Sequence, residues 1–197
     1  MTVQRLRIIL MRLIFGIAQT ASSALQEVNF GFQLAGRKGK AMRRKKIGVK
    51  DFHGSVDITD PCYNRAVWCR MNGVKIKEGE YTCLVWYHTD KGTDNGEPYA
   101  CKVVGIIGIY LDGRIPAQKA MKEIGSIGVD AGLAGFFHNK PDYDDDAWCA
   151  FCDRIRHGDA WITEDGFYSS SGYGDGCYGV YAQEQNGEIT ALEIRFR

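Results

Sequence analysis

Residues 168–178, with the sequence YSSSGYGDGCY, form the densest combination of turn-forming and strand-forming residues in the chain. Gly172, Gly174 and Gly176 permit positive φ angles and close approach of other backbone. Asp175 followed by Gly176 is typical of a tight turn between two strands. No helix pattern and no Lys-Ser or Lys-Thr pair follows these glycines, so the segment is neither a phosphate-binding loop nor a dinucleotide fingerprint. We therefore expect a tight corner in a β-rich fold.

Other segments show the alternation or the β-branched enrichment of strands, and turn residues bound them. The chain contains 24 glycines and 12% aromatic residues, a composition that suits sheets joined by tight turns. We expect strands over residues 54–60, 81–87, 100–111, 126–130, 131–137 and 189–196, a loop over 88–98, and helices over 116–124 and 142–156. The sequence thus predicts an all-β or β-dominated α+β fold. Its architecture would be a compact antiparallel sandwich or a partly open barrel with one or two short helices.

The first 41 residues differ in character from the rest of the chain. They carry six Lys and Arg residues and one Glu, and their apolar runs are too short and interrupted for a transmembrane helix. Three hypotheses fit this segment: upstream sequence translated ahead of a start at Met42, a secretory or organelle-targeting peptide, and a flexible arm. We assign residues 1–41 to an unstructured or amphipathic extension, 42–53 to a basic lead-in and 54–197 to a single β-rich domain.

Charge and cysteine content bear on the partners and the compartment. Residues 42–197 carry 19 basic and 23 acidic side chains, so no general affinity for nucleic acid is expected. The seven cysteines are scattered through apolar or aromatic runs, which favours mostly reduced and buried thiols in a cytoplasmic protein. Secretion would require residues 1–25 to act as a signal peptide.

Four aspartates end predicted strands and precede turn residues, namely Asp57, Asp60, Asp130 and Asp175. If these strand ends meet, the carboxylates can bind a divalent cation such as Mg²⁺ or Ca²⁺, or supply an acid and a base. The glycines beside Asp175 can also cradle an anion with their N–H groups. If the ends do not meet, each aspartate caps its own turn, which is the favoured interpretation because Asp is common in turns for local reasons. No cofactor is expected, and a divalent cation is the alternative.

Aromatic residues give a second indication of a binding surface. Several tyrosines and tryptophans can line a groove, although such residues more often fill a β core. They are Tyr63, Trp68, Trp86, Trp161, Tyr168, Tyr173 and Tyr178. The candidate binding corner combines some of them with the aspartates. It consists of Asp57, Asp60, Tyr63, Asp130, Tyr173, Asp175 and Gly176.

Three motifs occur in a fixed order along the chain. They are Asp-Pro-Cys-Tyr at 60–63, Gly-Val-Asp-Ala-Gly at 128–132 and Ser-Ser-Gly-Tyr-Gly-Asp-Gly at 170–176. Over about residues 54–197 the chain resembles bacterial and phage proteins related to the domain-of-unknown-function family numbered 4241. That pattern has serine where this chain has Ala131 and Cys177. The resemblance implies a small soluble β domain of bacterial or phage origin, and it implies no particular activity.

Two functional hypotheses follow. The first is a non-catalytic binding or interaction module, with a protein partner favoured, because no nucleophile–base pair and no complete metal-ligand pattern occurs in the sequence. The alternative is a metal-assisted hydrolase that uses Asp57, Asp60, Asp130 and Asp175. Whether the protein is an enzyme depends on where these carboxylates lie. Carboxylates around one shared point would favour the enzyme, and carboxylates bonded to their own turns would favour the module.

Overall fold

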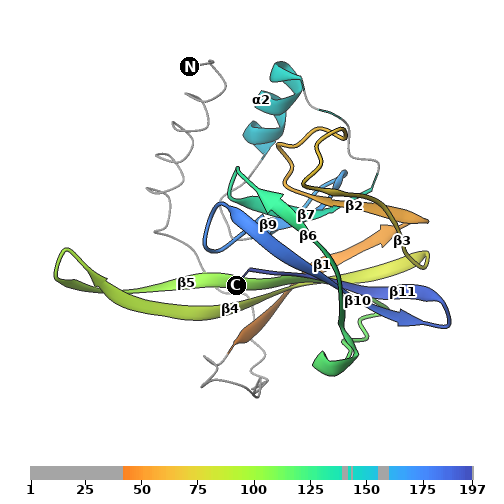
Figure 1. Cartoon of the computed structure of the whole chain (residues 1–197), viewed down its shortest axis with the longest axis horizontal. Coiled ribbons are helices and arrows are strands. Elements are labelled where there is room, and N and C mark those ends of the chain that lie inside the picture. Colours follow the sequence, from red (N-terminus) through yellow and green to blue (C-terminus); the bar gives the residue numbers. More distant parts are fainter. Residues whose placement is uncertain (1–41, 139–141, 143, 155–159, 197) are drawn as a thin grey trace.

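Two antiparallel β-sheets packed face to face form the body of the protein (Figure 1). The computed structural model describes residues 42–138, 142, 144–154 and 160–196. Within these residues neither sheet closes into a barrel, so the predicted β-dominated fold is confirmed as a sandwich. The predicted N-terminal extension, residues 1–41, lies outside the described part of the chain.

The larger sheet has six strands, and all of its neighbouring pairs are antiparallel. From edge to edge they are β1 (Arg43–Phe52), β4 (Gly79–Asp94), β5 (Glu97–Leu111), β11 (Glu188–Arg195), β10 (Gly176–Gln185) and β6 (Lys122–Val129). The basic run at residues 43–46, expected in a lead-in to the domain, is therefore part of an edge strand. Lysine and arginine side chains on such a strand discourage pairing with other chains.

The smaller sheet has five strands, which are also paired antiparallel. From edge to edge they are β3 (Met71–Lys75), β2 (Ser55–Thr59), β7 (Leu133–Phe137), β9 (Gly166–Ser170) and β8 (Ala160–Ile162). The sequence predicted β2 and β7 at nearly these positions, because their short apolar runs end at turn residues.

The main apolar core lies between the two sheets, because alternate residues of each strand face inward. In β4, Cys83, Val85 and Tyr87 belong to this core, whereas Leu84 belongs to a smaller cluster that includes Tyr110. Burying one large apolar side chain contributes about 1.5–3 kcal/mol. The period-two pattern therefore determines which face of each strand packs against the other sheet.

Helix α2 (Asp145–Arg154) covers the outer face of the smaller sheet (Figure 1). Phe151 packs there against Phe137 and Tyr168 in an apolar cluster separate from the main core. Asp144 caps the helix, since its Oδ1 atom accepts a hydrogen bond from the N–H of Ala147 at 2.7 Å. The predicted helix over 142–156 is confirmed for the residues of α2. Among the described helices, none has the length and apolar character needed to cross a bilayer.

The loop predicted over residues 88–98 is wrong. Strands β4 and β5 pair as far as Asp94 and Glu97, and they form a long hairpin that extends away from the body (Figure 1). Its turn is Asn95-Gly96, and both residues have positive φ angles, 49° and 87°. Most side chains at the far end of this hairpin are exposed, so the strands there lack the polar and apolar alternation that marks a half-buried strand.

The helix predicted over residues 116–124 is also largely wrong. Only a short 3₁₀ turn, η1 (Gln118–Ala120), forms in this segment. Strand β6 begins directly afterwards at Lys122 and pairs with β10 along its length. Pairing with a distant strand outweighs the local helix signals, as tertiary context commonly does for short segments.

Residues 171–175 connect the two sheets. Strand β9 before them belongs to the smaller sheet, and β10 after them belongs to the larger one. The tight corner predicted here is confirmed, but the hairpin expected from Asp175 and Gly176 is wrong, because the flanking strands do not pair with each other.

Candidate functional site

Hydrogen bonds bring the three sequence motifs together at one corner of the sandwich. The Oδ2 atom of Asp60 accepts hydrogen bonds from the N–H groups of Asp130 and Ala131, each at 2.7 Å. The carbonyl of Gly132 in turn accepts a hydrogen bond from the N–H of Ser171 at 2.9 Å. Segments that are far apart in the sequence therefore lie side by side where β2 ends.

Asp60 is the centre of this corner, and its exposed fraction is 0%. Its Oδ1 atom accepts a third hydrogen bond, from the N–H of Cys62 at 2.9 Å, and so closes a turn directly after β2. Burial raises the pKa of Asp60, and the three backbone N–H donors oppose that rise. Both carboxylate oxygens are engaged by the protein's own backbone, so Asp60 joins the first motif to the second.

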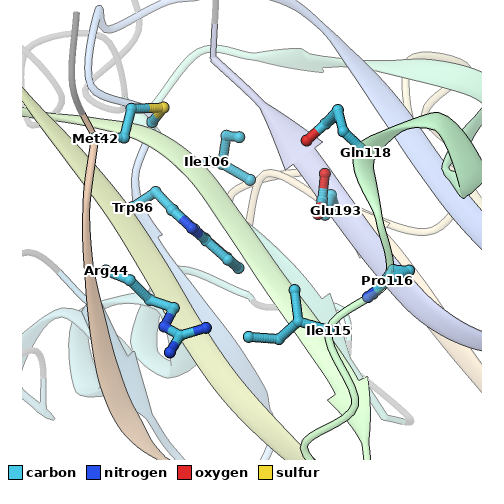
Figure 2. A pocket seen from close by; sticks show the side chains of 8 residues that line it. All are labelled: Met42, Arg44, Trp86, Ile106, Ile115, Pro116, Gln118 and Glu193. Carbon is cyan, nitrogen blue, oxygen red and sulfur yellow. The ribbon is translucent and has the colours of Figure 1, made fainter. Parts of the chain in front are cut away.

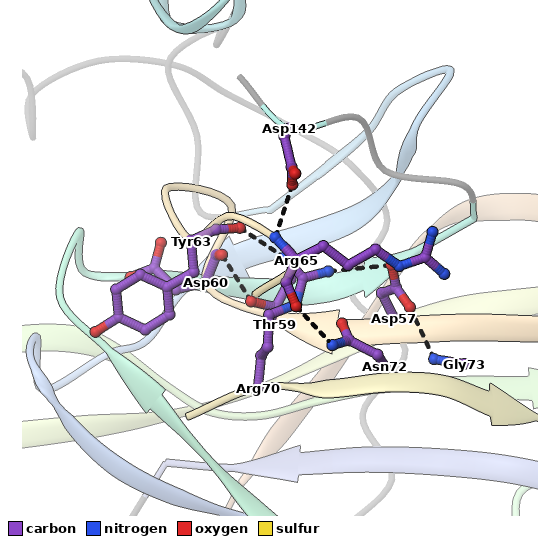
Figure 3. A network of polar contacts seen from close by, with 9 residues as sticks. All are labelled: Asp57, Thr59, Asp60, Tyr63, Arg65, Arg70, Asn72, Gly73 and Asp142. Carbon is purple, nitrogen blue, oxygen red and sulfur yellow. Dashed lines mark hydrogen bonds and ion pairs between the residues drawn. The ribbon is translucent and has the colours of Figure 1, made fainter. Parts of the chain in front are cut away.

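Asp57 forms a buried ion pair with Arg70 (Figure 3). The Oδ2 atom of Asp57 lies 3.0 Å from Nη2 of Arg70, and its Oδ1 atom accepts a hydrogen bond from the N–H of Gly73 at 2.8 Å. Burial lowers the pKa of Arg70, and the charge of Asp57 opposes that change. The Nε atom of Arg70 is buried and has no hydrogen-bond partner within the described residues. The guanidinium of Arg70 therefore has acceptors at Nη1 and Nη2 but none at Nε within the described residues.

The Asp57–Arg70 pair also fixes the loop of residues 60–70, which connects β2 to β3. Nη1 of Arg70 donates to the carbonyl of Tyr63 at 2.6 Å. The carbonyl of Arg65 accepts a hydrogen bond from the side chain of Asn72 at 2.9 Å. The loop is therefore tied down at two carbonyls along its length, as Figure 3 shows.

Two further contacts hold the same loop. The N–H of Arg65 donates to Oδ1 of Asp142 at 2.7 Å, which links the loop to the segment before α2. The carbonyl of Cys69 accepts a hydrogen bond from the N–H of Gly128 in β6 at 2.7 Å. Between these anchored positions lies Trp68, whose exposed fraction is 92%. A well-anchored loop thus presents an almost fully exposed tryptophan.

The glycine-rich segment packs against the β4–β5 hairpin. Gly172 has a φ angle of 75° and lies so close to the carbonyl of Val104 that a Cβ atom there would collide with it. The hydroxyl of Tyr173 lies 2.7 Å from Nε2 of His88 in β4, and the tyrosine is 52% exposed. Gly176 is the first residue of β10. Gly172 therefore serves close backbone packing at this corner.

The predicted site residues thus fall into two neighbouring groups. Asp57, Asp60, Tyr63 and Asp130 lie around the end of β2, and Tyr173, Asp175 and Gly176 lie in the glycine-rich segment. The two groups are joined through the hydrogen bond between Gly132 and Ser171.

Two of the four aspartates considered as metal ligands, Asp57 and Asp60, have carboxylates that other groups of the protein engage. Asp60 contacts Asp130 through a hydrogen bond from the N–H of Asp130. Asp57 is engaged by Arg70 and Gly73. Within the described part of the chain, no group of three or more His, Cys, Asp and Glu side chains is placed to hold a metal ion.

The aromatic residues considered from the sequence do not line one common groove. Tyr168 and Tyr178 are buried, and Trp86 and Trp161 are half-buried. Trp68 stands out by its exposure, which its neighbours Val67 and Cys69 in the sequence did not indicate. Sequence reasoning missed Arg70 entirely, because a charged residue between turn residues and a strand is expected on the surface.

Comparisons of the chain with protein-family models, with curated proteins and with solved structures gave no match. The resemblance to the family numbered 4241 therefore remains a prediction from the three motifs. Function has to be inferred from the geometry of the corner.

Proposed function

We propose that this protein is a non-catalytic interaction module that binds a protein partner through the loop of residues 60–70. Trp68 is its anchor residue. The observation that carries this proposal is the contrast between an exposed fraction of 92% at Trp68 and the anchored backbone on either side of it.

Exposure on this scale leaves a large apolar area in contact with water. A tryptophan buries about 150–250 Å² when it enters an interface. At about 25 cal/mol per Å², covering Trp68 would contribute on the order of 4–6 kcal/mol before the costs of association. Tryptophan and arginine are enriched among the residues that dominate binding energy, and the exposed Arg65 lies three residues before Trp68.

The anchoring of the loop supports the same function. Ordering a flexible loop on binding costs conformational entropy, so a loop that is already held loses less on association. The Asp57–Arg70 pair and the contacts of Asp60 hold the loop before any partner arrives. The predicted site residues Asp57, Asp60, Tyr63 and Asp130 therefore support the binding loop. In this proposal the module acts in the cytoplasm of a bacterium or a phage-infected cell and belongs with the 4241-related proteins.

Trp68→Ala tests this function. Wild type and Trp68→Ala would be immobilised and exposed to a lysate of the source cells, and the captured proteins quantified by mass spectrometry. A partner that wild type retains would then be purified and titrated against both proteins. We expect the dissociation constant to rise by about 30-fold or more for Trp68→Ala, as for a binding hot spot, while the melting temperature stays unchanged.

Tyr99→Ala is the matched control, because Tyr99 is an exposed aromatic residue on the β4–β5 hairpin. It should leave the affinity for that partner unchanged. A partner that binds wild type and Trp68→Ala equally well would contradict the proposal, as would equal losses in the two variants.

The metal-assisted hydrolase remains the second candidate, and a separate measurement addresses it. The oxygens of Asp57 and Asp60 already accept hydrogen bonds from internal donors, which supports the module. We expect millimolar Mg²⁺, Mn²⁺ or Ca²⁺ to leave the melting temperature of wild type unchanged. A metal-dependent rise that is lost in Asp130→Asn and Asp175→Asn would instead reveal a native-state metal site and favour the hydrolase.

A further inference from the structure

A small pocket lies on the outer face of the six-stranded sheet, on the side that faces away from the main core (Figure 2). Strands β1, β4, β5 and β11 form its floor, and the chain between β5 and η1 forms one wall. It is lined by Met42, Arg44, Trp86, Ile106, Ile115, Pro116, Gln118 and Glu193. None of these residues belongs to the loop proposed above to bind a partner.

One wall of the pocket carries a carboxylate that is already neutralised. Glu193 is 4% exposed. Its Oε1 atom accepts a hydrogen bond from the hydroxyl of Tyr110 at 2.8 Å. Its Oε2 atom accepts hydrogen bonds from Nε and Nη2 of Arg195, at 2.9 and 2.7 Å. Because both oxygens are engaged and one cation balances the charge, Glu193 has little left to offer a cationic ligand.

The opposite side of the pocket carries two donors that bond to no acceptor among the described residues. Within the described residues, the guanidinium of Arg44 takes part in no hydrogen bond or ion pair, although the residue is half-buried. The indole N–H of Trp86, which lies beside it in the pocket, also has no acceptor there. With the charges of Glu193 and Arg195 balanced, the pocket has one positive charge in excess. An anion is the ligand type that satisfies both donors.

The remaining walls are apolar. Ile106 and Ile115 lie near the indole ring of Trp86, and Pro116 lies across the pocket from it (Figure 2), so hydrocarbon would cover part of the ligand's body. The pocket encloses about 40 Å³ and is partly open to solvent, well below the roughly 300–1,000 Å³ of sites for drug-sized ligands. It therefore covers the anionic end and one face of a compact ligand, whose short aliphatic chain or single ring extends into the opening.

We propose that this pocket binds a small organic carboxylate, held at its anionic end by the guanidinium of Arg44 and the indole N–H of Trp86. Arginine suits this role because its planar fork of donors matches the two oxygens of a carboxylate. The apolar body of the ligand packs against Trp86 and Ile115. This site is independent of the protein-binding loop and of the four aspartates.

Benzoate and isovalerate are suitable probes, with benzamide as the neutral analogue and benzylamine as the cationic one. Each would be titrated into the full chain while the ¹H–¹⁵N resonance of the Trp86 indole is followed by NMR, with Trp86→Phe used to assign that resonance. We expect benzoate to shift this resonance and to bind at least about tenfold more tightly than benzamide, since a charge-assisted bidentate contact is lost in the amide. Benzylamine should not bind.

Arg44→Gln should abolish the preference for benzoate over benzamide, and Arg44→Lys should retain part of it because the charge remains without the fork. The matched control is Lys46→Gln, which removes an exposed cation two residues along β1. It should leave the binding of benzoate unchanged. Any of four outcomes would overturn the proposal. In wild type, these are equal affinities for benzoate and benzamide, or an indole resonance that does not move when benzoate is added. In the variants, they are a preference for benzoate that survives Arg44→Gln, or a loss of benzoate binding in Lys46→Gln as large as in Arg44→Gln.

Discussion

Asp57 and Arg70 form a buried ion pair, with 3.0 Å between Oδ2 of Asp57 and Nη2 of Arg70, at the point where the loop of residues 60–70 returns to the smaller sheet. The desolvation of two charges offsets much of their attraction, so a buried pair of this kind is only weak support for stability. Its geometry matters more here. The same arginine donates to the carbonyl of Tyr63, so one side chain joins strand β2 to the loop that presents Trp68.

Breaking this pair should be costly. Asp57→Asn leaves the buried guanidinium of Arg70 without its counter-charge, and such a change destabilises proteins by about 3–5 kcal/mol. We expect a decrease near the lower end of this range in the free energy of unfolding, measured by urea denaturation, because the amide retains one acceptor. Asp51→Asn is the control, since Asp51 is exposed on β1, and it should change the free energy by less than about 0.5 kcal/mol. Equal effects of the two substitutions would show that the pair does not hold the loop.

Asp60 gives a prediction about pH. Burial raises the pKa of Asp60 above its value in the unfolded chain, so the folded state binds the proton more tightly. The contribution of Asp60 to the free energy of unfolding is fully present below the pKa of Asp60 in the unfolded chain, which is about 4. This contribution is lost as the pH rises through the pKa of Asp60 in the folded protein. Asp60→Asn removes this titration. We therefore expect the difference in unfolding free energy, wild type minus Asp60→Asn, to fall as the pH is raised from 4 to 8.

Urea denaturation at pH steps of one unit measures this difference directly. A difference that grows with pH would contradict the prediction. It would mean that the three backbone N–H donors stabilise the carboxylate more than burial destabilises it.

The glycine-rich segment offers a comparison of two glycines that both have positive φ angles, 75° at Gly172 and 88° at Gly174. Gly174→Ala places its methyl group in open space, so we expect only the left-handed backbone cost of about 1–2 kcal/mol. Gly172→Ala also drives the methyl group against the carbonyl of Val104, which adds about 1–3 kcal/mol. Thermal and urea unfolding would compare the two variants. Equal losses would show that contact with β5 does not constrain Gly172.

Cysteine reactivity should differ strongly between two residues. Burial raises the pKa of the Cys83 thiol to about 12, whereas Cys177 is exposed at the start of β10. At pH 8 only about one Cys83 side chain in ten thousand is then a thiolate, and the thiolate is the reactive form. We expect iodoacetamide to label Cys177 within minutes and to leave Cys83 unmodified in the folded protein, as quantified by peptide mass spectrometry. Rapid labelling of Cys83 without unfolding would contradict its burial.

The expectation about cysteines also shows where sequence reasoning failed. Most of the seven cysteines were expected to be buried. The structure describes six of their side chains, and of these Cys83 is buried, Cys177 is exposed and the other four are intermediate. An apolar or aromatic neighbour along the chain says little about burial near a strand end, because successive side chains point to opposite faces.

Local signals in the sequence determined several elements of this protein. The period-two alternation of 189–196, the Asn186-Gly187 turn and the acidic start of α2 act between residues that are close along the chain. A β-dominated fold followed, either a sandwich or a partly open barrel, since many short strands with tight turns have few ways to bury their apolar faces.

The tertiary structure alone decided how these elements combine. It paired Lys122 and Glu123 with β10 where local signals favoured a helix, and it placed Asp175-Gly176 between two sheets where local signals favoured a hairpin. It also brought Arg70 to Asp57, and Asp130 to Asp60, across 13 and 70 residues of chain. Such contacts depend on strand order and sheet packing. These are set by the total free energy of burying apolar side chains that come from distant parts of the chain. A short stretch of sequence does not contain that information.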